Sequence, residues 1–167
     1  MKKKIYIAGF DVFRQDSIEI GKHYKNLCEK YGFIGLYPMD NEVDFNQEKN
    51  KIACDIFEAN KNMILQCDII IANLNPFRGK ESDSGTVWEC GFGYGLGKEV
   101  YGYIKSKKVY LENFSKNEKR KINGVYVDNE DMVIEDFDLA LNLMIGCSVK
   151  QLIFGEFEDV LKVISAK

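Results

Sequence analysis

The chain has 167 residues, of which 46% are hydrophobic and 29% charged, and its formal net charge is −3. These values predict one globular domain with a sizeable core and exclude a disordered chain. A net negative charge supplies no basic face for nucleic acid. No run of about 18 apolar residues predicts a membrane span. The apolar run after the first lysines is too short for a signal peptide and fits a strand better.

The cysteines and the single histidine limit the kinds of metal and redox site that the chain can form. The five cysteines are odd in number, have no CxxC spacing and stand in apolar runs. This pattern predicts buried thiols in a reducing compartment, so we expect a cytoplasmic protein. The single histidine, His23, excludes a His-rich metal centre and predicts a surface or packing role. We expect neither a metal site nor a cofactor.

Strand and helix patterns alternate along the chain. Strands are expected at 4–9, 33–37, 68–74 and 99–104, and helices at 15–30, 47–67, 84–96, 137–150 and 156–165. A fifth strand or a hairpin is expected near 124–127. Alternation implies parallel strands joined by right-handed crossovers. We predict a single α/β domain over residues 1–167, a doubly wound, flavodoxin-like (Rossmann-like), five-stranded parallel sheet with helices on both faces.

The most informative segment, Ser82–Gly97, follows the strand at 68–74 and a polar loop. Ligands of open α/β sheets bind outside the carboxyl ends of the strands, which makes this the expected place for a site. Asp83 or Ser84 is a natural helix N-cap, so a structural role stays open for Asp83. Glu89 stands among apolar residues, where a carboxylate needs a partner or a purpose. Its nearness to the helix N-terminus favours the ionised form, which suits a nucleophile.

Other residues allow two interpretations each. Gly9 ends the first strand, either as a turn residue or where a ligand approaches the backbone. Asn60 shares a helical face with apolar residues and serves either a structural carbonyl or a ligand. The alternate glycines 91–97 do not match a dinucleotide fingerprint, because Leu96 holds the place of the third glycine. We expect these glycines to bring their helix close to the sheet or to another subunit. Trp88 and the five methionines are expected in the core.

Several short segments occur in a characteristic order: Tyr6-Ile7-Ala8-Gly9-Phe10, Tyr37-Pro38-Met39-Asp40-Asn41, Asp68 to Asn73, Pro76-Phe77-Arg78-Gly79, Asp83-Ser84-Gly85-Thr86-Val87-Trp88-Glu89 and Asn142-Leu143-Met144. Through them the chain resembles the nucleoside 2-deoxyribosyltransferases over nearly its whole length. The resemblance implies exchange of the base on 2′-deoxynucleosides with free purine or pyrimidine bases. It also implies a covalent deoxyribosyl-enzyme on Glu89 and retention at C1′.

The resemblance also assigns roles to matched positions. Tyr6 would orient the nucleophile, and Asp83 would protonate the leaving base. Gly9 and Phe10 would line the base and sugar pocket, and Phe77 would help to keep water out of it. Asn60 stands where some members carry an aspartate for base recognition; an amide can hold a base edge but supplies a proton less readily. Asn142 would reach into the site of a neighbouring subunit, which implies a homo-oligomer, at least a dimer and commonly a hexamer.

Two alternatives remain at this point. A deoxynucleoside 5′-monophosphate N-glycosidase of the same superfamily would need a Ser/Gly-rich phosphate loop after the first strand. Asp11 stands in that loop and would repel a phosphate, which favours free nucleosides. A non-catalytic nucleoside-sensing module is the other alternative. A receiver domain is disfavoured, because Asn73 stands where a phosphorylatable aspartate is needed.

Overall fold

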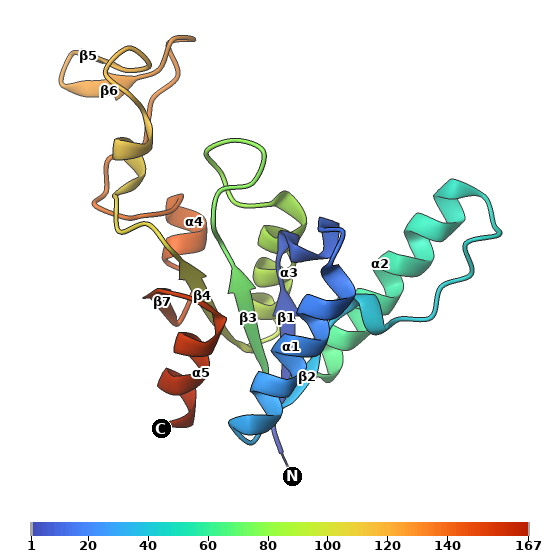
Figure 1. Cartoon of the computed structure of the whole chain (residues 1–167). Coiled ribbons are helices and arrows are strands. Elements are labelled where there is room, and N and C mark those ends of the chain that lie inside the picture. Colours follow the sequence, from blue (N-terminus) through green and yellow to red (C-terminus); the bar gives the residue numbers. More distant parts are fainter. Residues whose placement is uncertain (1, 167) are drawn as a thin grey trace.

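The protein is built on a parallel sheet, shown in the computed structural model of Figure 1, which describes residues 2–166. Five strands lie in the order β2-β1-β3-β4-β7, and each pair of neighbours is parallel. Their bounds are Ile34–Leu36 (β2), Lys4–Ala8 (β1), Ile69–Asn73 (β3), Glu99–Ile104 (β4) and Gln151–Phe154 (β7). This is the flavodoxin strand order, so the predicted fold class is confirmed.

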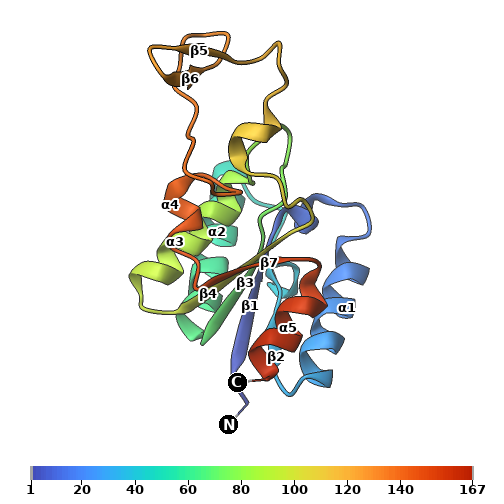
Figure 2. The ribbon, with the colours of Figure 1, turned by 90° about the vertical axis from the view of Figure 1, so that its left-hand side faces the viewer.

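Helices cover both faces of the sheet (Figure 2). They are α1 (Ser17–Lys30), α2 (Lys49–Gln66), α3 (Ser84–Gly95), α4 (Leu143–Gly146) and α5 (Phe157–Ser165), with short 3₁₀ turns at Phe10–Phe13 (η1), Pro38–Asp40 (η2) and Tyr110–Asn113 (η3). Side chains of α1 and α5 join one apolar core, which includes Ile7, Ile71 and Phe157. Side chains of α2, α3 and α4 join a second core on the other face, which includes Tyr6, Ile70 and Cys90. No helix in the described range is long and apolar enough to cross a membrane.

The C-terminal third differs from the sequence-based prediction. The helix expected at 137–150 is wrong, since only Leu143–Gly146 is helical. Of the two structures expected near 124–127, the hairpin is confirmed, since this segment pairs antiparallel with 120–122. The fifth strand of the sheet is instead β7, which pairs with β4 and was not predicted. The expected helix cannot form because Asp138 adopts a positive φ of 57° and Asn142 caps a new turn.

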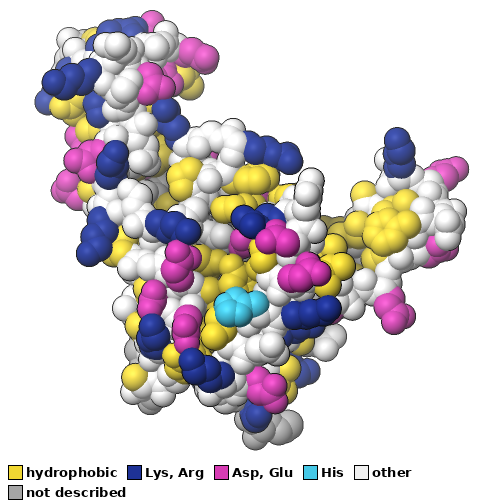
Figure 3. All heavy atoms as spheres, viewed as in Figure 1, with side chains coloured by type: hydrophobic (Ala, Val, Ile, Leu, Met, Phe, Trp, Pro, Cys, Tyr) yellow, Lys and Arg dark blue, Asp and Glu magenta, His cyan; other side chains and the backbone are white. Residues whose placement is uncertain are grey.

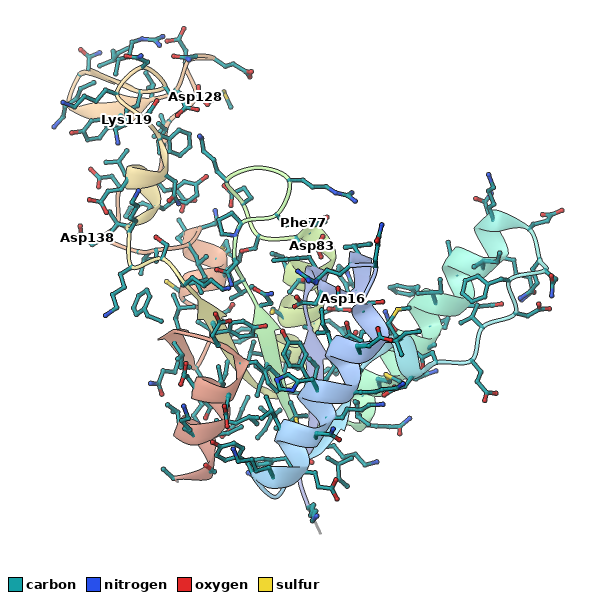
Figure 4. All side chains as sticks on the ribbon, in the orientation of Figure 1. Asp16, Phe77, Asp83, Lys119, Asp128 and Asp138 are labelled. Atoms are coloured by element: carbon teal, nitrogen blue, oxygen red, sulfur yellow. The ribbon has the colours of Figure 1, made fainter. Side chains whose placement is uncertain are left out.

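The hairpin consists of β5 (Arg120–Ile122) and β6 (Val125–Val127). It projects from the end of the sheet at which the parallel strands finish, in both Figure 1 and Figure 2. Figure 4 shows Lys119 and Asp128 far out on this projection and Asp138 nearer the body. We call residues 105–139 the arm. The arm therefore extends from the same end of the sheet as the expected site.

Several expectations of burial are wrong. Cys54 and Cys147 are exposed, whereas the other three cysteines are buried. Trp88 is 44% exposed, and Met39, Met132 and Met144 are exposed too. Among the alternate glycines only Gly93 presses on the sheet, where an added Cβ would lie 2.1 Å from Cδ1 of Ile70. The helix α3 thus packs on this core through residues that include Gly93 and Cys90, and its apolar residues Trp88 and Tyr94 are exposed.

Gly21 allows α1 to approach a buried ring. A Cβ added there would lie 2.3 Å from Cδ1 of Tyr37, whose side chain is almost fully buried. We expect Gly21→Ala to lower the free energy of unfolding by about 1–3 kcal/mol, because a rigid ring must shift in a packed core. The matched control is Gly91→Ala in α3, where nothing lies within 4 Å of the new atom. Urea denaturation should show a gain of about 0.5–1 kcal/mol for this control; equal effects of the two substitutions would contradict the packing argument.

Candidate active site

Glu89, which is partly buried, and Tyr6, which is fully buried, form a hydrogen-bonded pair. Tyr6 lies in the middle of β1 and is fully buried, and Glu89 lies in the second turn of α3. The hydroxyl of Tyr6 donates to Oε1 of Glu89 at 2.5 Å. Strand and helix thus fix the carboxyl group by one short bond, and Oε2 is not used in it. The structure thus brings Tyr6 and Glu89 together, as the sequence predicted; the orienting role of Tyr6 stays a prediction.

The electrostatics of Glu89 differ from the sequence-based expectation. Burial raises the pKa of Glu89 to about 7; the hydrogen bond from Tyr6 opposes this rise, and the charge of Asp83 adds to it. The helix N-terminus was expected to favour the ionised form, whereas the loss of water around the carboxyl group, the largest cause of the shift, favours the protonated form. Burial also raises the pKa of Tyr6 far above its usual value, so its hydroxyl keeps the donated proton.

A pocket of about 360 Å³ opens beside Glu89. Its other lining residues are Phe57, Asn60, Gly85 and Trp88. Phe57 is 45% exposed, and its ring lies 5.2 Å from that of Trp88, centroid to centroid. Two aromatic rings, an amide and a carboxyl group are the side chains that hold a planar, polar ring compound.

Asn60 is fixed by a neighbouring amide. Its Oδ1 accepts from Nδ2 of Asn41 at 2.9 Å, and the same Nδ2 also donates to the carbonyl of Pro38 at 3.0 Å. The structural and the ligand-binding interpretations of Asn60 are therefore compatible. One end of the amide is held by the protein, and the residue lines the pocket with its Nδ2 group not engaged in these contacts.

Asp83 is the N-cap of α3. Its Oδ2 accepts from the backbone N–H of Thr86 at 2.9 Å and from the Thr86 hydroxyl at 2.8 Å. The capping role left open by the sequence is thus occupied. Both bonds go to one oxygen, so Oδ1 stays outside the cap. Asp83 is also close enough for its charge to act on Glu89.

Comparison with known proteins identifies the family of this chain. The family model named Nucleoside 2-deoxyribosyltransferase matches residues 5–144. The chain belongs to this family. A 2-desoxiribosyltransferase from Leishmania mexicana is 30% identical and superposes with a TM-score of 0.78, covering 98% of this chain and 97% of that one.

Two further relatives are more distant. The 2-deoxyribosyltransferase of Bacillus psychrosaccharolyticus shares 20% identity and a TM-score of 0.62, over 95% of this chain and 90% of that one, which supports the fold. An uncharacterized protein of Schizosaccharomyces pombe is 31% identical over 111 residues, or 65% of this chain. The match spans only 53% of that curated relative.

Three residues that the family resemblance assigned to substrate binding lie together but do not line the Glu89 pocket. They are Gly9, Phe10 and Phe77. The rings of Phe10 and Phe77 stack at 5.0 Å, and Figure 4 shows Phe77 and Asp83 at the same end of the sheet. Gly9 faces β3, since a Cβ there would lie 2.8 Å from Cβ of Asn73. Phe10 lines a pocket on the other face of the sheet.

Asn142 does not line the Glu89 pocket within this protomer. It caps α4 by accepting from the backbone N–H of Met144 at 3.0 Å, and it donates to Oε1 of Glu135 at 2.7 Å.

Residues 2–166 contain no group of three or more His, Cys, Asp or Glu side chains arranged to hold a metal ion.

Sequence reasoning missed several residues of the pocket. Phe57 lies one helical turn before Asn60, so the i, i+3 spacing could have indicated a shared face toward the ligand. Trp88, next to Glu89, was expected in the core. Asn41 and Thr86 each lie within matched segments but gave no signal of their bonds to Asn60 and Asp83. Cys90 also adjoins Glu89, but burial raises the pKa of its thiol to about 12, which agrees with a packing role.

Proposed function

We propose that this protein is a nucleoside 2-deoxyribosyltransferase that exchanges the base of 2′-deoxynucleosides through a covalent deoxyribosyl-Glu89 intermediate. One observation supports the proposal most: a buried carboxyl group is held by Tyr6 at the wall of an aromatic pocket, in a chain of this family. Free nucleosides and bases are the substrates of salvage reactions, and five free thiols fit a reducing cytoplasm.

The reaction uses the two oxygens of Glu89 differently. Tyr6 holds Oε1, so Oε2 attacks C1′ of the sugar while the bond from C1′ to the base nitrogen breaks. The departing base keeps the bonding electrons and takes a proton from an acid. An incoming base then returns its N–H proton to that acid, attacks C1′ and releases the Glu89 carboxylate, and two inversions give retention.

The pocket supplies contacts for the base. The rings of Phe57 and Trp88 offer an apolar surface on which a planar base can lie. Since Oδ1 of Asn60 accepts from Asn41, the Nδ2 group of Asn60 is the part that can donate to an acceptor on the base. Every purine and pyrimidine carries such an acceptor, so this contact binds bases of both kinds.

Asp83 is the proposed acid, and a substitution can remove its ability to donate a proton while keeping its role as the N-cap of α3. Asparagine caps a helix as well as aspartate does, but it carries no exchangeable carboxyl proton. We expect Asp83→Asn to retain the thermal stability and to lower kcat for base exchange about 10²–10⁴-fold. Asp83→Ala should lose both activity and about 1 kcal/mol of stability. An Asp83→Asn enzyme with full activity would assign the proton to another group.

The shared site is the second part of the proposal. Asn142 donates a hydrogen bond to Glu135 in its own protomer and does not reach the Glu89 pocket there. Apolar side chains of α2, α3 and α4 are exposed, and a second subunit could cover them. They are Ile56, Phe57, Leu65, Trp88, Tyr94, Leu96 and Met144. We propose a homo-oligomer, a dimer or hexamer, in which Asn142 binds the sugar hydroxyls in a neighbouring site. Mixing inactive Glu89→Gln and Asn142→Ala subunits by unfolding and refolding should restore activity in mixed oligomers. A mixture as inactive as its parents would contradict shared sites.

The test of the function is chromatography of purified protein with deoxyinosine, with and without adenine. Deoxyadenosine formed only when adenine is present supports transfer. Free hypoxanthine without deoxyadenosine would make the protein a hydrolase, and faster cleavage of deoxynucleoside 5′-monophosphates would favour the N-glycosidase alternative. Base binding without turnover would indicate a sensing module.

A further inference from the structure

A second pocket lies on the opposite face of the sheet from Glu89. Its volume is about 400 Å³. It is bounded by η1, by α1, by the ends of β3 and β4 with the loops that follow them, and by the start of α5. The lining residues are Phe10, Asp11, Arg14, Ile20, Tyr24, Asn73, Asn75, Tyr103, Lys105 and Glu156. It shares no lining residue with the Glu89 pocket. The pocket lies at the carboxyl ends of β1 and β3, where parallel sheets of this topology bind ligands.

The second pocket is lined by a buried carboxylate, that of Asp11, which a hydrogen bond holds in place. Asp11 is 9% exposed, and its Oδ2 accepts from Nδ2 of Asn73 at 2.8 Å. Asn73 is 5% exposed and is itself held, since its Oδ1 accepts from the backbone N–H of Asn75 at 3.2 Å and from Nδ2 of Asn75 at 2.7 Å. The carboxylate therefore has a defined position, and its Oδ1 is not used in these bonds.

The cations around the pocket are already paired. Arg14 binds Asp16 at 2.9 Å, and Lys105 binds Glu156 at 3.1 Å, all through side chains that are at least half exposed. Figure 3 shows this face, on which acidic and basic side chains lie next to each other. Within residues 2–166 no ammonium or guanidinium group pairs with Asp11. The guanidinium of Arg14, which is held by Asp16, acts on the charge of Asp11 only over a longer distance. A buried carboxylate without a close counter-ion is costly in a protein interior.

The walls of the second pocket suit a cation. Phe10 and Tyr24 offer aromatic rings, whose faces attract positive charge. The hydroxyls of Tyr24 and Tyr103 lie 3.5 Å apart, and their oxygens can accept from an ammonium group. We infer that this pocket binds a small organic cation, a primary alkylammonium, whose head group donates to Asp11 and to these phenol oxygens. The inference does not depend on the proposed transferase function.

The probe for this site is 1,4-diaminobutane, titrated calorimetrically into the full-length protein at low salt, with 1,4-butanediol as the uncharged ligand of equal length. The diamine should bind at least about tenfold more tightly than the diol, and Asp11→Asn should weaken its binding at least about tenfold, the loss expected for a charged hydrogen bond. Lys105→Ala should tighten binding, because it removes a positive charge and frees Glu156. Glu89→Gln should bind the diamine as the wild type does.

Four results would overturn the inference. They are absence of diamine binding at millimolar concentration, equal affinity for the diol, unchanged affinity in Asp11→Asn, and loss of binding in Glu89→Gln, which would place the diamine in the other pocket. If Asp11→Asn fails to fold, the binding of the diamine by Lys105→Ala tests the inference instead, because Lys105 is exposed and its loss should not affect folding. Weaker or equal binding by Lys105→Ala would then contradict the assigned charge. Diamine binding that persists in an enzyme without exchange activity separates this inference from the proposed function.

Discussion

Replacing Glu89 with glutamine is expected to lower kcat for base exchange at least about 10⁴-fold, as removal of a catalytic nucleophile does in other enzymes. An amide oxygen is too weak a nucleophile to form the proposed bond to C1′. The substitution keeps the size of the side chain and an acceptor for the Tyr6 hydroxyl, which donates to Oε1 in the native protein. The loss therefore reports the nucleophile rather than the pocket.

Two measurements check this result. Chromatography of deoxyinosine with adenine gives the exchange rate, and intact-mass analysis of the wild type with deoxyinosine alone should show the deoxyribosyl adduct. The control is Glu29→Gln, an exposed glutamate of α1 on the far side of the sheet, which should exchange bases at the native rate. Exchange at more than about a hundredth of the native rate by Glu89→Gln would remove Glu89 from the role of nucleophile.

The sheet could be predicted from the sequence because most of its strands carry their own signal. Ile69–Asn73 is apolar at nearly every position, as expected for a parallel strand that is buried on both faces. The last strand carries no such signal. Gln151–Phe154 has four residues, of which only Ile153 is buried, and its conformation depends on pairing with β4. A single sequence read locally contains no information on that partner.

The chemistry of the site was only partly predictable. The position of Glu89 followed from its apolar neighbours, but the direction of its pKa shift did not, because burial raises this pKa and depends on side chains far away in the sequence. The bond to Tyr6 joins residues 83 positions apart and was expected only from the family resemblance. Phe57 enters the pocket because α2 packs beside α3, a contact that helical periodicity cannot specify.

Apolar residues around the pocket between α2 and α3 are not covered by the chain itself, although one of them, Trp88, was expected in the core. Ile56, Phe57 and Trp88 fit a core pattern, yet all three are exposed in the protomer. Their apolar character instead fits a surface for a planar ligand or for a second subunit. Binary patterning therefore identifies apolar faces correctly but cannot say whether the chain itself covers them.

The raised pKa of Glu89 has a cost in stability that the same variant, Glu89→Gln, should reveal. A carboxyl group with a pKa of about 7 in the folded protein and about 4.5 in the unfolded chain binds its proton more tightly when folded. Its contribution is therefore fully present below pH 4.5 and is lost as the pH rises through 7. At pH 8 the ionised, buried Glu89 should destabilise the fold by about 3 kcal/mol relative to its protonated form.

Glu89→Gln should remove this penalty. We expect its Tm to exceed that of the wild type by about 6–12 °C at pH 8, with the gap closing toward pH 4, whereas Glu29→Gln should show no such gap. The same proton should control catalysis, since only the ionised carboxylate attacks C1′, and kcat/KM for exchange should rise with pH up to about 7. A pH-independent difference in Tm would contradict this linkage, whereas matched midpoints in Tm and in rate would show that one buried carboxyl group limits stability in order to act as a nucleophile.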